Sequence, residues 1–167
     1  GGCAMPGNPI PTSASLRVAQ RALIAWVKDG AEPPPSRYPS LANGDLVPPT
    51  AAAMGWPGKP GAPKPDGHIN AFVAQDFGPA FRPRDVRGAM THVPPRVSRI
   101  FASLVPRVDG DGNEISGVPS VQLLVPLGTY TGWNEAARGY AKGGGCGFEG
   151  GFIPFARTRT ERLQNGD

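Results

Sequence analysis

The sequence predicts a folded but loop-rich chain, in which one amphipathic helix is followed by a long Pro- and Gly-rich extension with short β-strands. Of the 167 residues, 24 are Gly and 21 are Pro, a composition more typical of low-complexity chains than of compact domains. However, the formal net charge is only +4, and the chain holds three Trp, three Tyr and seven Phe. Such a chain either builds a poor core alone or belongs to a larger core.

The helix is expected between Ser13 and Asp29. Its large apolar residues and one alanine recur at helical spacing on one face: Leu16, Ala19, Leu23, Trp26 and Val27. A hydroxyl of Thr12, Ser13 or Ser15 can cap the first turn. Gly30 is well placed to end the helix in a left-handed conformation.

The extension begins with a proline-rich stretch, residues 31–66. The run Pro33-Pro34-Pro35 favours polyproline II, and a helix or central strand is not expected because proline lacks the amide donor. A flexible linker is one interpretation. Trp56, Tyr38 and Leu41 favour another, an ordered coil wrapped over a neighbouring surface.

Strands are expected within residues 69–73, 97–108 and 118–127, which are rich in β-branched and aromatic residues. The polar sequence DGDGNE separates the last two, which predicts a hairpin or a long turn. Prolines in these segments limit them to edge or broken strands. A short helix is expected within residues 133–141.

Most catalytic motifs are absent from the sequence. It has no G-x-S-x-G pentapeptide, the usual elbow of a serine hydrolase. The sequence 109–114 starts like a calcium loop but lacks the required Gly and Glu. His68 and His92 are the only imidazoles, and neither has a second ligand nearby. We therefore expect no metal or cofactor. The basic residues form no run, so nucleic-acid binding is the least favoured function.

Two further features leave alternatives open. Tyr130, Thr131, Trp133 and Asn134 combine aromatic rings, a hydroxyl and an amide after a predicted strand. This composition suits a substrate-pocket wall and a packed corner about equally. Cys3 and Cys146 are either a long-range disulfide or two free thiols.

Three long strings of the sequence are distinctive: AWVKDGAEPPPSRYPSLANGDLVPP, LVPRVDGDGNEISGVPSVQLLVPLGTYTGWN and GGFIPFARTRTERLQNGD. Together they resemble the C-terminal part of a bacterial family of alpha/beta hydrolase domain proteins. The resemblance covers residues 3–167. It implies an α/β hydrolase-related fragment: residues 1–30 would be a lead-in and the last core helix, and residues 31–167 a C-terminal extension packed on the hydrolase core.

The resemblance also implies an esterase-like serine hydrolase whose triad lies upstream of Gly1, so no catalytic residue is assigned in this chain. The start, without Met or a signal peptide, is then expected to be a cut or mature end. The partners would be the N-terminal hydrolase portion and a small ester-type substrate, with no membrane span and no nucleic acid. A secreted or periplasmic location and a Cys3–Cys146 disulfide are expected. The alternative is a non-enzymatic exported binding or structural module that docks to another protein.

Overall fold

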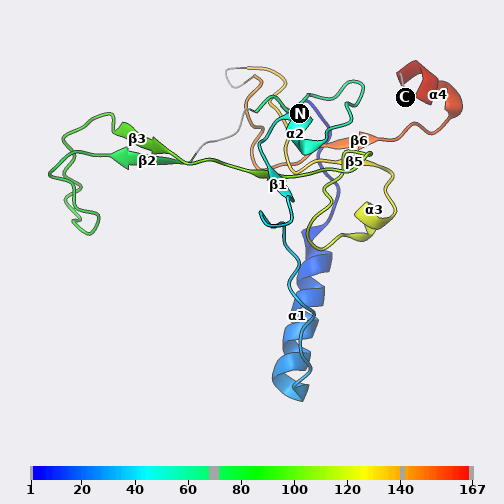
Figure 1. Cartoon of the computed structure of the whole chain (residues 1–167), viewed down its shortest axis with the longest axis horizontal. Coiled ribbons are helices and arrows are strands. Elements are labelled where there is room, and N and C mark those ends of the chain that lie inside the picture. Colours follow the sequence, from blue (N-terminus) through cyan, green and yellow to red (C-terminus); the bar gives the residue numbers. More distant parts are fainter. Residues whose placement is uncertain (1, 68–71, 140–141, 166–167) are drawn as a thin grey trace. The chain divides into compact units, whose positions relative to one another are not determined.

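The computed structural model (Figure 1) describes residues 2–67, 72–139 and 142–165. The helices are α1 (Thr12–Asp29), α2 (Ala51–Met54), α3 (Val121–Leu124) and α4 (Arg159–Asn165). The strands are β1 (Leu46–Val47), β2 (Val73–Asp76), β3 (Arg96–Ile100), β4 (Val105–Pro106), β5 (Gly128–Tyr130) and β6 (Phe152–Pro154). The chain divides into two compact units: the first is Gly1–His68 with Val105–Asp167, and the second is Ile69–Leu104.

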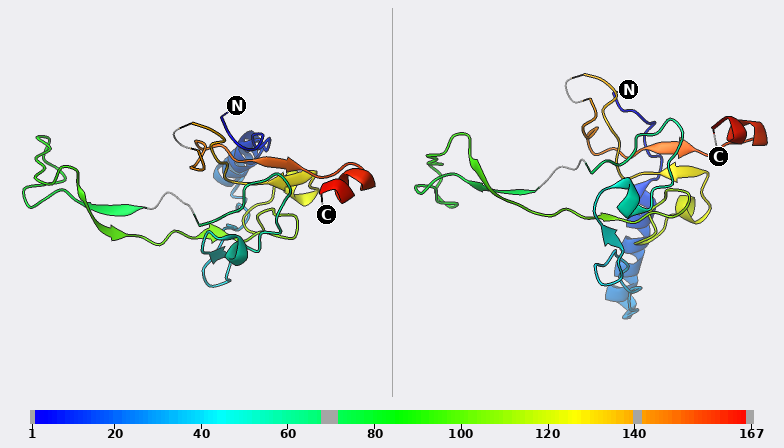
Figure 2. Two further views of the ribbon diagram at one scale, coloured as in Figure 1. Left: turned by 90° about the horizontal axis from the view of Figure 1, so that it is seen from above. Right: turned by 45° about the horizontal axis from the view of Figure 1, so that its top comes forward.

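Helix α1 confirms the expected helix. It ends as predicted, because Gly30 adopts a φ of 68° and donates its amide to the last turn. The predicted hydroxyl cap is wrong. The N-cap residue is Pro11, whose side chain has no acceptor, and no side chain caps the first turn. The coil that follows α1 runs back alongside it (Figures 1 and 2).

A four-residue helix interrupts the proline-rich segment, contrary to the expectation that it holds no helix. The prolines flank Ala51–Met54 and do not fall inside it. The hydroxyl of Thr50 accepts a hydrogen bond from the amide of Ala53, and Gly55 ends the helix with a φ of 76°. Local capping therefore produces one helical turn between prolines.

The described strands form three separate antiparallel pairs: β1 with β4, β2 with β3, and β5 with β6. The strand prediction for residues 97–108 is confirmed in part by β3 and β4. Of the two alternatives predicted for DGDGNE, the turn is formed, and around it the described residues make a single bridge, between Val108 and Glu114. The other alternative, a hairpin of paired strands, is not formed by the described residues, because β4 pairs with β1 from the proline-rich segment.

Two other local predictions are corrected. Residues 118–127 hold the short helix α3, since Pro119 and Pro126 remove strand donors and the carbonyl of Ser120 accepts from two amides of the helical turn. In place of a helix, the described part of 133–141 makes two isolated bridges. Of the predicted strand 69–73, residues 69–71 lie outside the described residues, and β2 begins at Val73.

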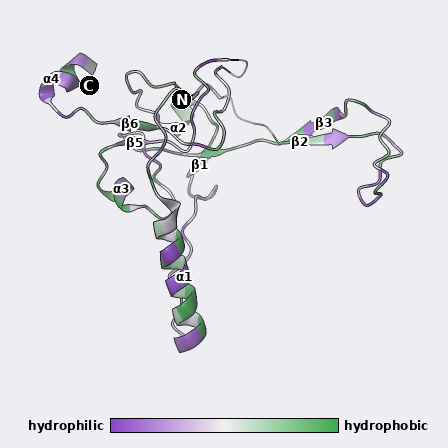
Figure 3. Ribbon diagram, turned by 180° about the vertical axis from the view of Figure 1, so that it is seen from behind, coloured by the Kyte–Doolittle hydropathy of each residue, from purple (hydrophilic) through white to green (hydrophobic). Residues whose placement is uncertain are grey.

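Few described side chains are buried. In the first unit the buried apolar residues are Met5, Ala51, Met54, Trp56 and Tyr130, and the buried polar residues are Asn113, Thr129, Thr131 and Asn134. No described residue of the second unit is buried. Figure 3 shows hydrophobic and hydrophilic residues side by side on α1, which itself buries none. No helix within the described ranges combines the length and hydropathy of a membrane span.

Candidate functional site

The four pocket-wall candidates lie together in the first unit, where the end of β5 meets the N-terminal segment and the strand β6. Tyr130 is the last residue of β5 and pairs with Phe152 of β6. One residue before β6, Gly151 exchanges backbone hydrogen bonds with Thr131 and bridges Gly7 on its other side. The N-terminal segment, residues 150–152 and β5 are thus held as neighbours.

The two aromatic candidates each have an aromatic partner. The ring of Tyr130 lies on that of Phe152 with centroids 5.0 Å apart. Trp133 meets Trp56 at 5.7 Å in a tilted arrangement. Trp56 is buried, whereas Trp133 is only half-buried. Aromatic pairs in such geometries stabilise packing beyond their area. The exposed part of Trp133 remains open to a ligand.

The polar candidates, Thr131 and Asn134, form hydrogen bonds with backbone groups. The Thr131 hydroxyl donates to the Trp133 carbonyl at 2.5 Å and accepts from the Gly151 amide at 2.8 Å. The side-chain amide of Asn134 accepts from the Met5 amide at 3.1 Å and donates to the Met5 carbonyl at 2.9 Å. Both side chains are therefore committed to holding segments together, and the features left for a substrate are aromatic.

The disulfide between Cys3 and Cys146 is present in the structure, with the two Cα atoms 5.7 Å apart. It lies beside the Asn134 contacts, because the Cys146 amide donates to the carbonyl of Asn134 at 2.8 Å. The bond and the two hydrogen bonds to Met5 fix the N-terminal segment to residues 134–146. The sequence could suggest the pair, but only the fold shows that Asn134 reinforces it.

Sequence reasoning missed Asn113 as a buried contact. Its side-chain oxygen accepts from the Tyr130 amide at 2.7 Å, and its amide donates to the Gly128 carbonyl at 3.2 Å. Asn113 belongs to the DGDGNE turn, whose first residue, Asp109, accepts from the amides of Asp111 and Asn113 at 2.9 Å. The turn is therefore closed by the side chain of Asp109, together with the hydrogen bond from the Asp109 amide to the Asn113 carbonyl at 2.8 Å. Nothing in the sequence distinguishes an inward Asn from a solvated one.

His92 is not among the residues that contact the four candidates. His92 lies in the second unit, where its Nδ1 is 3.1 Å from a carboxylate oxygen of Asp76 without the alignment of a hydrogen bond. His68 lies outside the described residues. Within the described ranges, no three His, Cys, Asp or Glu side chains gather as a metal site would require.

Comparison with protein families shows which family the chain belongs to. The family model of an alpha/beta hydrolase domain matches residues 1–165, so the chain belongs to the alpha/beta hydrolase domain family. No curated protein and no solved structure matches it. The expected resemblance to alpha/beta hydrolase domain proteins is thereby confirmed. The described strands are nevertheless short antiparallel pairs, whereas helix-flanked α/β sheets are mostly parallel.

Proposed function

We propose that this chain is the C-terminal portion of a serine-type, esterase-like α/β hydrolase. Residues 1–30 supply a lead-in and the last helix of the hydrolase core, and residues 31–167 form an extension that packs on that core. The nucleophile, the triad histidine and the acid belong to the N-terminal portion. Family membership supports the hydrolase class, and the absence of a G-x-S-x-G elbow from the sequence supports a nucleophile supplied elsewhere.

The exposed apolar surface of α1 carries the proposal. Leu16, Leu23 and Val27 are 62%, 54% and 76% exposed. At about 100° per residue, the large apolar side chains between Leu16 and Val27 cover about 240° of the helix circumference, well beyond the usual stripe of a surface helix. A helix of this kind is expected to be covered on more than one side, as a helix packed on a sheet beside other segments would be.

Other described segments expose large apolar side chains as well, such as Leu41, Phe72 and Leu127. Exposed apolar area on this scale marks interaction surfaces. The hydrolase core is the partner that the family provides.

The proposed reaction is cleavage of a small ester-type substrate. In the N-terminal portion a serine hydroxyl would attack the acyl carbonyl while a histidine takes its proton, and the acyl-enzyme would then be hydrolysed. This chain would contribute a cover and an aromatic wall, formed by the open side of Trp133 with Tyr130 behind it. The disulfide supports an oxidising location, secreted or periplasmic.

Labelling with a fluorophosphonate probe tests where the nucleophile lies. The non-reduced protein is purified with its N-terminal portion, labelled and measured by intact mass spectrometry. We expect a species well above 17.4 kDa and the label on the N-terminal portion. A label on a serine of residues 1–167 would contradict the proposal.

Substitution of the aromatic wall tests the pocket role. Trp133→Ala is expected to lower kcat/KM for a small ester about tenfold, or ~1.4 kcal/mol of transition-state binding. Tyr38→Ala is the matched control, because Tyr38 is 72% exposed in the proline-rich coil. Tyr130→Phe keeps the contact with Phe152 and separates loss of the hydroxyl from loss of packing. Unchanged turnover in Trp133→Ala and Tyr130→Ala would exclude the wall.

A second candidate function is a non-enzymatic exported module that docks to another protein. It is favoured by one observation: the first unit has its own buried polar cluster, Asn113, Thr129, Thr131 and Asn134, next to a disulfide. If a single 17.4 kDa species shows a cooperative melting transition and binds no serine-bearing partner, this function takes precedence.

A further inference from the structure

The second unit carries most of the net positive charge of the chain. It contains five arginines and no lysine, against two aspartates and no glutamate, which gives +3 of the chain's formal +4. None of its described residues is buried. A segment with this charge asymmetry and no core is expected to act through its surface.

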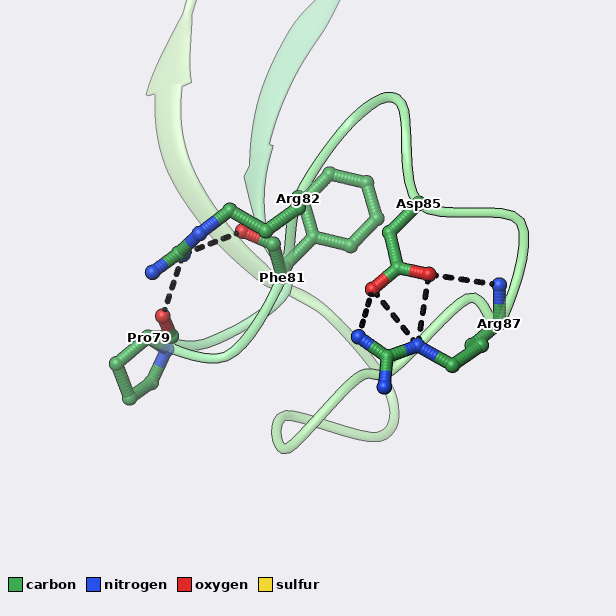
Figure 4. A network of polar contacts seen from close by, with 5 residues as sticks. All are labelled: Pro79, Phe81, Arg82, Asp85 and Arg87. Carbon is green, nitrogen blue, oxygen red and sulfur yellow. Dashed lines mark hydrogen bonds and ion pairs between the residues drawn. The ribbon is translucent and has the colours of Figure 1, made fainter.

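The positive charge extends into a closed loop between β2 and β3 (Figure 4). At the neck of the loop, the carbonyl of Phe77 accepts from the amides of Thr91 and His92 at 2.9 and 3.2 Å. Gly78 has a φ of 96°, and a Cβ there would overlap the Thr91 hydroxyl. Because the neck needs glycine and is pinned by two hydrogen bonds, the loop has a defined shape before any ligand arrives.

Inside the loop, one ion pair is structural and two arginines retain free donors. Arg87 donates from Nε and its terminal nitrogen to both carboxylate oxygens of Asp85, at 2.7 to 3.1 Å. Arg82 uses one nitrogen to bond the carbonyls of Pro79 and Phe81 at 2.9 Å (Figure 4). Arg84 makes no hydrogen bond or ion pair with any described residue. Arg82 and Arg84 therefore carry positive charge without a carboxylate partner.

Aliphatic side chains accompany these arginines. Val86 is 102% exposed between Arg84 and Arg87, and Met90 and Val93 are also exposed. Val86 is thus a fully exposed side chain that lies between two arginines in the sequence. An exposed aliphatic side chain next to arginines suits the headgroup layer of a membrane, where phosphates meet the first methylenes.

From this combination, we propose that the loop 77–93 binds the surface of an anionic phospholipid bilayer. The guanidinium groups of Arg82 and Arg84 would contact lipid phosphates, for which their planar forks are suited, and Val86 would enter the headgroup layer. The second unit would lie on the membrane and not cross it. This binding is independent of the proposed hydrolase activity.

The loop fits other anionic partners less well. Single-stranded nucleic acid would be bound by stacking of its bases on exposed rings, but Phe77 and Phe81 face each other with centroids 4.5 Å apart and are half-buried. An acidic protein chain would be held by a free strand edge, but the arginines concerned lie in the loop and not in β2 or β3. Neither partner gives Val86 an apolar environment.

Vesicle co-sedimentation of the full chain tests the proposal. We expect binding to vesicles of phosphatidylcholine and phosphatidylglycerol, none to phosphatidylcholine alone, and loss of binding at about 1 M salt, where the screening length is roughly 3 Å. Arg84→Gln should weaken binding about fivefold, since one basic residue near an anionic surface contributes about that factor. Val86→Asp should weaken it at least as much, and circular dichroism should show that both variants keep their fold.

Arg159→Gln is the matched control, because it removes the same charge from an exposed position in α4 of the first unit. It should bind as the unchanged chain does. No binding to the anionic vesicles would overturn the proposal. So would binding by Arg84→Gln and Val86→Asp that is as strong as that of the unchanged chain, or a complex with polyglutamate that competes with the vesicles and is insensitive to Val86→Asp.

Discussion

At the scale of a single residue, the side chain of Asn113 pairs with β5 as a neighbouring strand would. It is 1% exposed, and its side-chain amide pairs with the backbone of β5 on both sides of Thr129. Asn134 does the same for Met5. In a chain with few paired strands, these amides satisfy backbone groups that a longer sheet would otherwise pair.

Asn113→Ala should therefore be strongly destabilising. The Gly128 carbonyl and the Tyr130 amide would lose their partner, and each unsatisfied buried group costs about 1 to 3 kcal/mol. We expect the free energy of unfolding in urea to fall by about 2 to 5 kcal/mol. Asn43→Ala, at an exposed turn position, is the control and should change it by about 0.5 kcal/mol or less. Equal effects of the two substitutions would show that the Asn113 contacts contribute nothing.

Asp85 provides a pH test at the same scale. Its hydrogen bonds with Arg87 lower the pKa of the Asp85 carboxyl below its usual 3.8, and they raise the pKa of Arg87. Because the pKa is lower in the folded chain, the ion pair favours folding above pH 3.8, and this contribution is lost as the pH falls through the folded pKa. An NMR titration should show the lowered pKa, and Arg87→Gln should return it toward 3.8. An unshifted Asp85 would mean that the ion pair does not persist in solution.

At the scale of elements, β5 and β6 pair because glycine allows a close approach. A Cβ at Gly128 would overlap the carbonyl oxygen of Ile153 and lie 3.0 Å from the Cα of Pro154. Those atoms belong to the backbone of β6 and cannot move aside as a flexible side chain could. The pairing of these two short strands therefore requires glycine at position 128.

Gly128→Ala is expected to disrupt this pairing, at a cost of about 1 to 3 kcal/mol typical of overpacking. Gly132→Ala is a close control: Gly132 lies four residues further on, its φ is not positive, and a Cβ there meets nothing within 4 Å. The midpoint of urea unfolding would be measured, together with the hydrogen-exchange protection of the Thr131 amide, which donates to the carbonyl of Gly151 next to β6. Protection that survives in Gly128→Ala would contradict the proposed close approach.

At the scale of the whole molecule, the disulfide closes almost the entire chain. Cys3 and Cys146 are 143 residues apart in sequence, and in the chain-entropy model a loop of that length stabilises the fold by roughly 4 to 5 kcal/mol. The first unit has few buried apolar side chains, so this contribution is a large part of a typical stability.

Replacing both cysteines, Cys3→Ser with Cys146→Ser, should therefore lower the free energy of unfolding by roughly 4 to 5 kcal/mol. The same loss should follow when the unchanged protein is melted with a reductant, which is the matched comparison. Mass spectrometry of the non-reduced protein would count the thiols. Two free thiols in the native sample would contradict the disulfide.

Structure that depends on neighbouring residues could be predicted from the sequence. The helix Thr12–Asp29 and its end at Gly30 follow from apolar spacing and one glycine, because a helix is stabilised by contacts within a few residues. The resemblance to alpha/beta hydrolase domain proteins also came from the residues alone. The short helices at Ala51–Met54 and Val121–Leu124 were not predicted from the sequence, because the prolines on both sides of each segment argue against a helix.

The tertiary structure decided which strands pair with one another. Strand β4 pairs with β1 and not across the DGDGNE turn, and no pattern within either segment encodes that choice, because pairing depends on which backbones meet. The same reason applies to Tyr130, Thr131, Trp133 and Asn134. Their composition suits a pocket or a corner, and only the contacts with Met5, Gly151 and Trp56 show which polar atoms are already bonded. The sequence by itself determined that a helix forms and ends at Gly30 and which family the chain resembles. The fold decided which distant segments satisfy one another's buried groups, because those contacts depend on which backbones meet.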